Sequence, residues 1–357
     1  MVTMEDIAKR LGVTKGTVSK AMNGAEDVSE SLRKTVLETA VEMGYTRIAR
    51  RGKSKSVCVF VTNMEYEKPE DFGAELILGF RQMAEPVGFA VTVVPLNPET
   101  QARYSYDEYM LKNRYEGAFL LGLSFKDPWM EDFKVCRTPA VLYDSPVFMN
   151  PVVTSISINN FEGMSLAAAW LKSLGHRRIG YLGGALGSYI YQVRYAAFFN
   201  AMKENGLELD ETMTGVAYYA SDCLKQHFQR IIDLGCTAII CSHDLLAHAV
   251  MIHCNECGLR VPDDLSVIGV DDIPLCRHTT PPLSSIRQNR LDLGRSAFYA
   301  LSSQLAKIPV STLTLHAELI RRASVAPPTA RQILTETMET VKRPVENTSR
   351  DSFNQTT

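Results

Sequence analysis

The sequence alternates short apolar runs with amphipathic, helix-like segments between residue 57 and about residue 325, and this pattern constrains the fold more than any other feature. Strands that are almost continuously apolar are buried on both faces, and helical connections join parallel strands. We therefore predict an α/β region of two doubly wound parallel-sheet subdomains, because about 270 residues are more than one sheet comfortably holds. The candidate strands are residues 57–61, 90–96, 117–123, 140–143, 178–184, 238–242 and 265–270.

Length and composition agree with two or three domains. The chain has 357 residues, of which 45% are hydrophobic, and this supplies ample core. No apolar run reaches the roughly 20 residues that cross a bilayer, and the polar start has no signal-peptide core. We therefore expect a cytoplasmic protein without membrane contact. The eight cysteines lie mostly in apolar segments, which favours reduced core residues over a disulfide framework.

The first 45 residues have a different pattern, which predicts three short helices. Thr3, Thr14 and Ser29 are residue types that start helices, and each precedes a segment with apolar residues at helical spacing. Thr3 with Asp6 resembles a capping box, although the usual partner is Glu or Gln. Gly12 marks a tight turn between the first two helices.

The first two helices fit a helix-turn-helix. Ala8 is small where two helices would cross, Gly12 can adopt the positive φ of the turn, and Val18 would face Ala8. In such a unit the second helix enters the DNA major groove. Residues 1–56 carry eleven basic and seven acidic side chains, a balance of +4 in a chain of net charge −2, which indicates an anionic partner at this end. The alternative is a solvated helical pair with no binding role.

The outward positions of the second helix are Lys15, Gly16, Ser19 and Lys20. Lysines can contact guanine edges or phosphates, while small hydroxyl and amide side chains suit phosphate oxygens. A glycine in the first turn of a helix costs about 1 kcal/mol relative to alanine, so helix stability does not explain Gly16.

The segment "TMEDIAKRLGVTKGTVSKAMNGAEDVSESLRKTVLETAVEMGY", residues 3–45, resembles the DNA-binding domain of the lactose-repressor (LacI) family. The resemblance implies that Lys15, Gly16 and Lys20 contact bases, and that a homodimer binds a near-palindromic operator. Lys20 stands where arginine is usual in the family. The predicted DNA-contacting residues are Thr14, Lys15, Gly16, Thr17, Ser19, Lys20, Asn23, Ser29, Tyr45, Arg47, Arg50 and Arg51.

Residues 46–56, "TRIARRGKSKS", form a basic linker that departs from the family pattern. Family members generally carry a hinge helix here whose leucine inserts into the minor groove. This linker is about five residues shorter, and Gly52 falls near the place of the leucine. Because glycine disfavours a helix and has no apolar side chain, we expect weak or absent intercalation, with the linker arginines and lysines contacting phosphates or the minor groove instead.

Residues 57–326 are similar to the family's ligand-binding and dimerisation domain, which has the fold of type I periplasmic sugar-binding proteins. The matching segments include "LKSLGHRRIGYLGG", "AIICSHDLLAHAV" and "GLRVPDDLSVIGVDDIPLCRHTTPPLSSIRQ". The resemblance implies a ligand site at the carboxyl ends of the strands, which is also where open α/β sheets bind ligands. Residues 327–357 are polar, and we expect a flexible tail.

The predicted ligand contacts combine carboxylates and a guanidinium, which can pair with vicinal hydroxyls, with aromatic faces that can cover a sugar ring. Alternatively, Asp144 and Asp271 cap helices or turns and Arg194 pairs with one of them. A histidine stands where the family commonly has asparagine, so ligand choice or its pH dependence can differ. The next residue, Asp244, is expected to cap a helix. The predicted ligand contacts are Phe72, Asp144, Arg194, Tyr219, His243 and Asp271.

Two motifs that resemble functional sites are interpreted as a core helix and as a tight turn near the cleft. The segment "HDLLAHAVMIHCNEC" has enough His and Cys for zinc, but His253 and Cys257 share the apolar face of one helix, so we expect no metal. The turn "GYLGGALGS" lacks the spacing of a dinucleotide fingerprint, and no nucleophile or metalloprotease motif is present. We expect no cofactor and no enzyme activity.

The sequence thus predicts an all-α helix-turn-helix domain joined to an α/β effector domain. The expected function is transcriptional regulation, as a repressor whose operator affinity changes when a small polar ligand, most simply a sugar, binds. Two rival hypotheses stay open: a soluble carbohydrate-binding sensor with weak DNA binding, and an enzyme acting on a carbohydrate.

Overall fold

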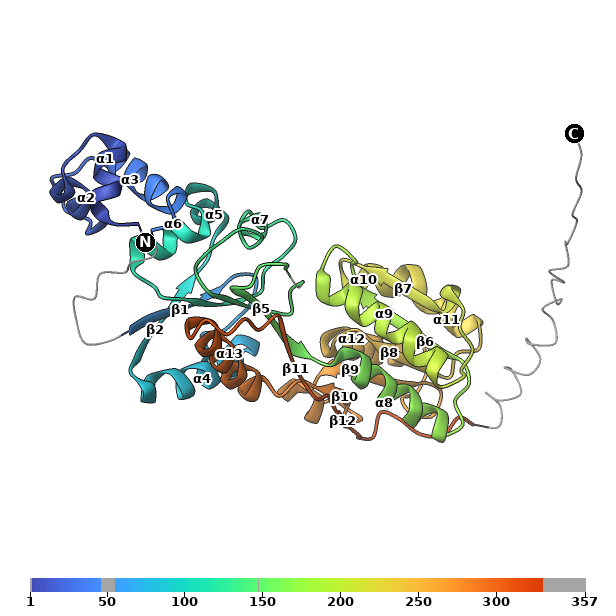
Figure 1. Ribbon diagram of the computed structural model, residues 1–357. Helices are drawn as coiled ribbons and strands as arrows, with labels where there is room; N and C mark the ends of the chain where they lie inside the picture. Colours follow the sequence, from blue (N-terminus) through green and yellow to red (C-terminus); the bar gives the residue numbers. More distant parts are fainter. Residues whose placement is uncertain (1, 46–54, 147, 330–357) are drawn as a thin grey trace, which may run out of the picture. The chain divides into compact units, whose positions relative to one another are not determined.

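The computed structural model describes residues 2–45, 55–146 and 148–329 (Figure 1). Its contacts divide the chain into two compact units. Unit 1 comprises residues 1–163, 186–194 and 287–318, and unit 2 comprises residues 164–185, 195–286 and 319–357. The predictions for Arg47, Arg50, Arg51 and Gly52, and for the polar tail from residue 330, lie outside the described residues.

The N-terminal helical domain consists of α1 (Met4–Leu11), α2 (Lys15–Met22) and α3 (Glu30–Glu42). The capping box at α1 is present with an aspartate, since the Thr3 hydroxyl accepts from the Asp6 amide at 3.3 Å and Asp6 accepts from the Thr3 amide at 2.9 Å. Gly12 has φ +67° in the turn, as the helix-turn-helix requires. The three helices share a small core that includes Ile7, Ala8, Val18, Val36 and Tyr45.

Unit 1 also contains the first α/β sheet, with strand order β11-β5-β4-β3-β1-β2. Every neighbouring pair in it is parallel. Its strands are β1 (Lys55–Val61), β2 (Phe89–Pro95), β3 (Ala118–Leu121), β4 (Ala140–Tyr143), β5 (Val153–Ile158) and β11 (Thr312–Leu315). Its helices are α4 (Phe72–Ala84), the turn η1 (Glu85–Val87), α5 (Pro98–Arg103), α6 (Tyr106–Asn113), α7 (Trp129–Asp132) and α13 (Arg290–Leu305).

Unit 2 contains the second sheet, with order β12-β10-β9-β8-β6-β7. The pairs β6–β7, β6–β8 and β8–β9 are parallel. Its strands are β6 (Ile179–Gly184), β7 (Thr214–Ala217), β8 (Ala238–Cys241), β9 (Ser266–Asp271), β10 (Ser284–Arg287) and β12 (Glu318–Ile320). The helical segments are α8 (Asn160–Ser173) and α9 (Tyr189–Glu204), which have residues in both units, and η2 (Glu211–Met213), α10 (Ala220–Cys223), η3 (Leu224–Phe228), α11 (Gln229–Asp233), α12 (Asp244–Glu256) and η4 (Pro274–Arg277).

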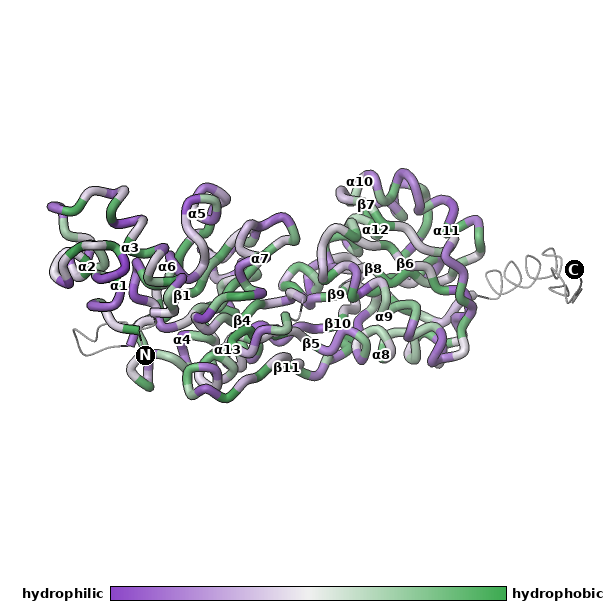
Figure 2. The backbone as a smooth tube through the Cα atoms, turned by 45° about the horizontal axis from the view of Figure 1, so that its top comes forward, coloured by the Kyte–Doolittle hydropathy of each residue, from purple (hydrophilic) through white to green (hydrophobic). Residues whose placement is uncertain are grey.

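The two doubly wound parallel sheets confirm the predicted fold class, and all seven candidate strands are present. The hydrophobic colour in Figure 2 follows strands such as β6 and β8, whose residues are all buried. The sequence analysis missed β5, because Thr154 and Ser155 interrupt its apolar pattern. Both hydroxyls are buried and donate to carbonyl oxygens, Thr154 to Val310 and Ser155 to Ser145, each at 2.6 Å.

Seven of the eight cysteines are buried and all are free thiols, as expected for core residues. One detail of the prediction is wrong. Helix α12 buries Cys254 among the core side chains and leaves Cys257 exposed, so Cys257 does not lie on the apolar face. No helix in the described part of the chain is long and apolar enough to cross a membrane.

Two glycines allow α4 and α13 to pack closely within unit 1. A Cβ atom at Gly79 would lie 2.1 Å from the Leu291 carbonyl oxygen, and one at Gly294 would lie 2.0 Å from the Leu76 carbonyl oxygen. The two helices therefore touch through backbone atoms at both glycines. A side chain there requires the backbones to separate, and repacking a core in this way costs about 1–3 kcal/mol.

We therefore expect Gly294→Ala to destabilise unit 1, although alanine favours helix by about 1 kcal/mol. The measurement is the urea midpoint of unfolding followed by circular dichroism. Gly187→Ala is the control, because its Cβ would meet no atom within 4 Å. An unchanged or higher midpoint for Gly294→Ala, relative to this control, would show that the helices do not depend on the close approach.

Candidate functional site

The exposed face of α2 carries two lysines near its ends. The Lys15 and Lys20 side chains are 66% and 59% exposed, and their ion-pair partners, Glu5 and Asp27, are exposed as well. Ion pairs between solvated side chains contribute little stability, so both ammonium groups are available to an anionic partner at small cost.

Hydroxyl and amide groups at both ends of α2 hold its backbone. Thr14 caps the helix, because its hydroxyl accepts from the Thr17 amide at 3.1 Å. At the other end, the Asn23 amide group donates to the Ser19 carbonyl at 2.7 Å and accepts from Arg114. Ser29 caps α3 by accepting from the Leu32 amide at 3.3 Å. These side chains thus have structural partners, and their predicted phosphate contacts remain predictions.

Gly16 is not required by the packing of the N-terminal helical domain. A Cβ atom there would meet only the Thr14 hydroxyl oxygen, at an ordinary 3.5 Å. The fold therefore accepts a side chain at this position, and the predicted role of Gly16 on DNA stays a prediction. Tyr45 differs from the other predicted contacts, since only 6% of it is exposed. The structure favours a packing role for Tyr45, and its DNA contact stays a prediction.

In unit 1, the predicted ligand residues Phe72 and Asp144 occupy the start of α4 and the position after β4. The Phe72 ring lies 6.3 Å from the Tyr143 ring, and the Arg290 guanidinium lies over its face at 5.1 Å. Asp144 has φ +46°, a left-handed conformation that turns the chain sharply as it leaves the strand.

Arg194, the third predicted residue of unit 1, lies in α9 and is 3% exposed. Its Nε donates to the Asn160 side-chain oxygen at 3.2 Å, and Asn160 is buried too. A buried guanidinium presents a planar set of charged N–H donors to the groups around it.

Sequence reasoning missed two aromatic residues of unit 1. Phe125 follows β3, the neighbour of the strand that precedes Asp144, and is 43% exposed. Its ring contacts that of Tyr189 edge to face, with centroids 6.3 Å apart. Burial, and to a lesser extent the Asp144 carboxylate, raise the pKa of Tyr189, so this hydroxyl stays protonated and lies close to the carboxylate. The signal was available, because Phe125 occupies the same strand-end position as the residues that were chosen.

In unit 2, the three predicted ligand residues all follow strands of one parallel set. His243 comes two residues after β8, Asp271 ends the adjacent β9, and Tyr219 comes two residues after β7. Because these strands run in the same direction, the three residues share one edge of the sheet. The His243 Nδ1 lies 2.9 Å from the Ser242 hydroxyl. Tyr219 is 63% exposed and its ring meets that of Tyr218 at 4.8 Å.

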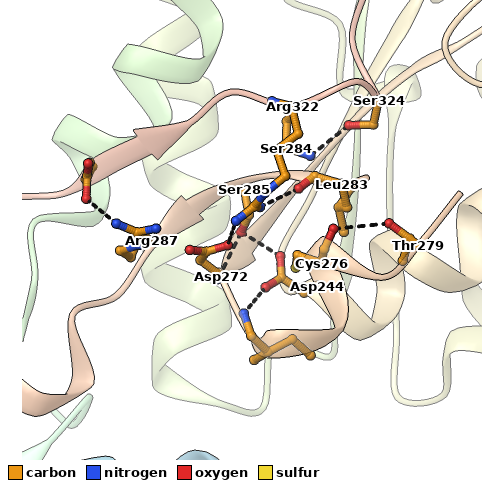
Figure 3. A network of polar contacts seen from close by, with 12 residues as sticks. Asp244, Asp272, Cys276, Thr279, Leu283, Ser284, Ser285, Arg287, Arg322 and Ser324 are labelled. Carbon is orange, nitrogen blue, oxygen red and sulfur yellow. Dashed lines mark hydrogen bonds and ion pairs between the residues drawn. The ribbon is translucent and has the colours of Figure 1, made fainter. Parts of the chain in front are cut away.

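Asp244 does not cap α12, which corrects the prediction. The capping position is His243, and the Asp244 carboxylate reaches out of the helix to accept from the Ser285 hydroxyl at 2.6 Å and the Ile273 amide at 2.9 Å (Figure 3). A salt bridge of 2.6 Å between Arg322 and Asp272 continues this polar network. The hydrogen bonds to Ser285 and Ile273, which are distant in the sequence, therefore decide the role of Asp244 rather than its position before the helix.

No three His, Cys, Asp or Glu side chains within residues 2–45, 55–146 and 148–329 gather as metal ligands would. His253 instead lies between the Glu256 carboxylate, at 3.4 Å from its Nδ1, and the Cys257 sulfur, at 3.7 Å from its Nε2.

Comparison with known families assigns both parts of the chain. Residues 3–47 match the model described as "Bacterial regulatory proteins, lacI family", and residues 168–325 match a "Periplasmic binding protein-like domain". Curated relatives include the HTH-type transcriptional repressor PurR of Mannheimia succiniciproducens, 30% identical over 91% of this chain and 99% of the relative. The HTH-type transcriptional repressor CytR of Escherichia coli is 27% identical over 90% of this chain and 96% of its own.

Solved structures give the same picture of the fold. A complex of the transcriptional regulator CelR with cellobiose has a TM-score of 0.64 at 25% identity and covers 91% of this chain and all of that chain. The lac repressor dimer bound to operator and the anti-inducer ONPF has a TM-score of 0.62 at 24% identity, with 91% of this chain and 99% of that chain covered.

Proposed function

Because the chain belongs to the LacI family of bacterial regulatory proteins, we propose that it is a transcriptional repressor whose affinity for an operator is set by a small polar ligand. The family consists of DNA-binding regulators rather than enzymes. The observation that carries the proposal is the complete helix-turn-helix with an exposed cationic face on α2, in one chain with two ligand-binding-type α/β sheets.

On DNA, we propose that Lys15 and Lys20 contact bases while Gly16 lets the backbone of α2 approach the groove. The residues with short polar side chains around α2 would contact phosphates. A homodimer would place two copies of α2 on the two halves of a near-palindromic operator, since helix-turn-helix proteins bind half-sites one helical turn apart.

For the ligand, we propose a sugar whose contacts come from the strand-end residues of the α/β sheets. Two features support this class. Asp144, Arg194 and Asp271 provide the charged hydrogen-bonding groups that hold vicinal hydroxyls, and Tyr219 and Phe125 provide exposed aromatic faces for the apolar side of a sugar ring. The solved relative with cellobiose is consistent with a sugar ligand in this fold. A flat nucleobase would also stack on such aromatic faces, and the test below separates the two classes.

The test is a thermal-shift panel on the full chain with cellobiose, lactose, glucose, glucose 6-phosphate, hypoxanthine and cytidine. A ligand that binds only the native state raises its stability in proportion to the logarithm of ligand concentration. We expect at least one of the four sugars to raise the melting temperature in this way, and neither of the two others to do so. A shift with hypoxanthine or cytidine alone would contradict the sugar assignment.

The rival hypothesis of a carbohydrate sensor with weak DNA binding is decided by DNA selection. If the purified protein enriches no common sequence from a pool of randomised duplexes but still responds to a sugar, the repressor proposal is wrong and the sensor is correct.

A further inference from the structure

The turn that follows β9 has a strained backbone. Asp271 and Asp272 are consecutive non-glycine residues with φ of +110° and +50°. Such left-handed conformations are unfavourable for residues with a Cβ and persist only where surrounding contacts hold them. Because Asp271 is one of the proposed ligand contacts, whatever holds this turn also sets the position of a ligand-binding carboxylate.

The buried Asp244 carboxylate accepts hydrogen bonds that fix the turn. One of its oxygens accepts from the Ile273 amide at 2.9 Å, and the other accepts from the Ser285 hydroxyl at 2.6 Å. The Ser285 oxygen in turn accepts from the Asp272 amide at 3.0 Å (Figure 3). Two successive backbone amides of the turn, those of Asp272 and Ile273, are therefore fixed by Asp244, one directly and one through Ser285.

The neighbouring strand is shaped around this carboxylate. A Cβ atom at Gly269, two residues before Asp271, would lie 2.1 Å from an Asp244 carboxylate oxygen. Only glycine leaves room for the carboxylate to pass so close to β9. On its far side the turn is tied by Arg322, which pairs with Asp272 at 2.6 Å and donates to the Leu283 carbonyl at 2.6 Å.

Asp244 is 1% exposed. Burial, and then the charge of Asp271 on β9, raise the pKa of Asp244 to about 7. The other facing groups are the Cys241 thiol from β8 and the Cys276 thiol from η4, which burial keeps protonated by raising their pKa, and Asp272 with its partner Arg322. Asp244 is thus a group of this network whose charge state is sensitive to pH near neutrality.

We propose that Asp244 is a positioning residue of the ligand site, which fixes the Asp271–Ile273 turn through its hydrogen bonds to the Ile273 amide and the Ser285 hydroxyl. This inference rests on the proposed ligand-binding role of Asp271. A ligand that covers Asp271 removes water from the neighbourhood of the Asp244 and Asp271 carboxylates. Two negative charges close together are then less favourable than one. The complex therefore holds the proton to higher pH than the free protein does, and affinity rises as pH falls through about 7.

The first experiment needs no ligand. In the full chain labelled with ¹⁵N-isoleucine, the Ile273 amide reports directly on the carboxylate to which it donates. We expect its chemical shift to titrate near pH 7 in the wild type and in the control Asp233→Asn, which removes an exposed carboxylate of the same unit. In Asp244→Asn, which keeps the hydrogen-bonding shape without the charge, the titration should vanish. An Ile273 shift that is constant from pH 5.5 to 8.5, or that titrates equally in Asp244→Asn, would overturn the proposal.

The second experiment measures cellobiose affinity by calorimetry at pH 6 and pH 8. If binding raises the pKa of Asp244 by about half a unit, the wild type binds cellobiose about threefold more tightly at pH 6 than at pH 8. One pKa unit corresponds to a tenfold change in affinity. Asp244→Asn should remove this dependence, and Asp244→Ala should weaken binding at both values. A pH dependence that persists in Asp244→Asn would contradict the proposal. If cellobiose does not bind the wild type, the measurement is made with another sugar that raises the melting temperature; if none of the four sugars binds, the sugar assignment fails, while the Ile273 titration still decides the role of Asp244.

Discussion

The double variant Lys15→Ala, Lys20→Ala is expected to lose operator affinity by about 30-fold to 20,000-fold, because each side chain that contacts a base contributes about 1–3 kcal/mol. Both side chains are exposed and paired only with exposed carboxylates, so the N-terminal helical domain should fold normally without them. The measurement is a fluorescence-anisotropy titration of the duplex that the wild type selects from a random pool, at fixed salt.

The control for this variant is Lys34→Ala, which removes an exposed lysine of α3 whose partner is Glu38. It should bind operator within a few-fold of the wild type. The double variant should also lose more affinity for the operator than for a scrambled duplex, since base contacts carry the specificity and phosphate contacts do not. Equal operator binding by the double variant and Lys34→Ala would mean that α2 does not contact the bases.

Arg194→Ala is expected to abolish the response to ligand while leaving operator affinity within a few-fold of the wild type. The guanidinium is buried beside the Asn160 amide and is the only predicted ligand contact with a positive charge. Removing it takes away the planar pair of charged donors that a guanidinium supplies, which costs about 10-fold to 100-fold in affinity at a charged hydrogen-bonding site. The measurement is the cellobiose thermal shift, with operator binding as the test of folding.

Two further variants make the Arg194 result specific. Arg194→Lys keeps the charge but loses the planar pair of donors, and it should recover little of the response. Arg177→Ala removes an exposed arginine of unit 2, which donates to the Lys172 and His176 carbonyls, and should respond like the wild type. A normal thermal shift in Arg194→Ala would show that the ligand binds elsewhere.

The elements that could be predicted from the sequence are those specified by local pattern. The runs that became β1, β8 and β9 are almost continuously apolar, and the turn at Gly12 has a conformation that few other residues adopt. The strand β5 could not be predicted in this way, because its Thr154 and Ser155 are buried through hydrogen bonds to Val310 and Ser145. Those partners are not visible in the local sequence.

In the candidate site, too, local pattern identified some residues, while others depend on contacts between distant parts of the sequence. Asp144, His243 and Asp271 lie at or just after the ends of β4, β8 and β9, as the strand pattern predicted, and the same rule would have found Phe125. Asp244 was misassigned because an aspartate before a helix is usually its cap, whereas here Ser285 and Ile273, 41 and 29 residues further on, supply its partners. Tertiary hydrogen bonds, which sequence spacing does not encode, decide such cases.

The central claim is that one chain couples operator binding to a small ligand. Its most direct test is the anisotropy titration of the selected operator with the wild-type protein, carried out without ligand and with each sugar that raised the melting temperature. Coupling between two sites usually amounts to 1–3 kcal/mol, so we predict that at least one sugar shifts operator affinity by about 5-fold to 150-fold. If a sugar binds the protein but leaves operator affinity unchanged, the account of a ligand-controlled repressor is contradicted.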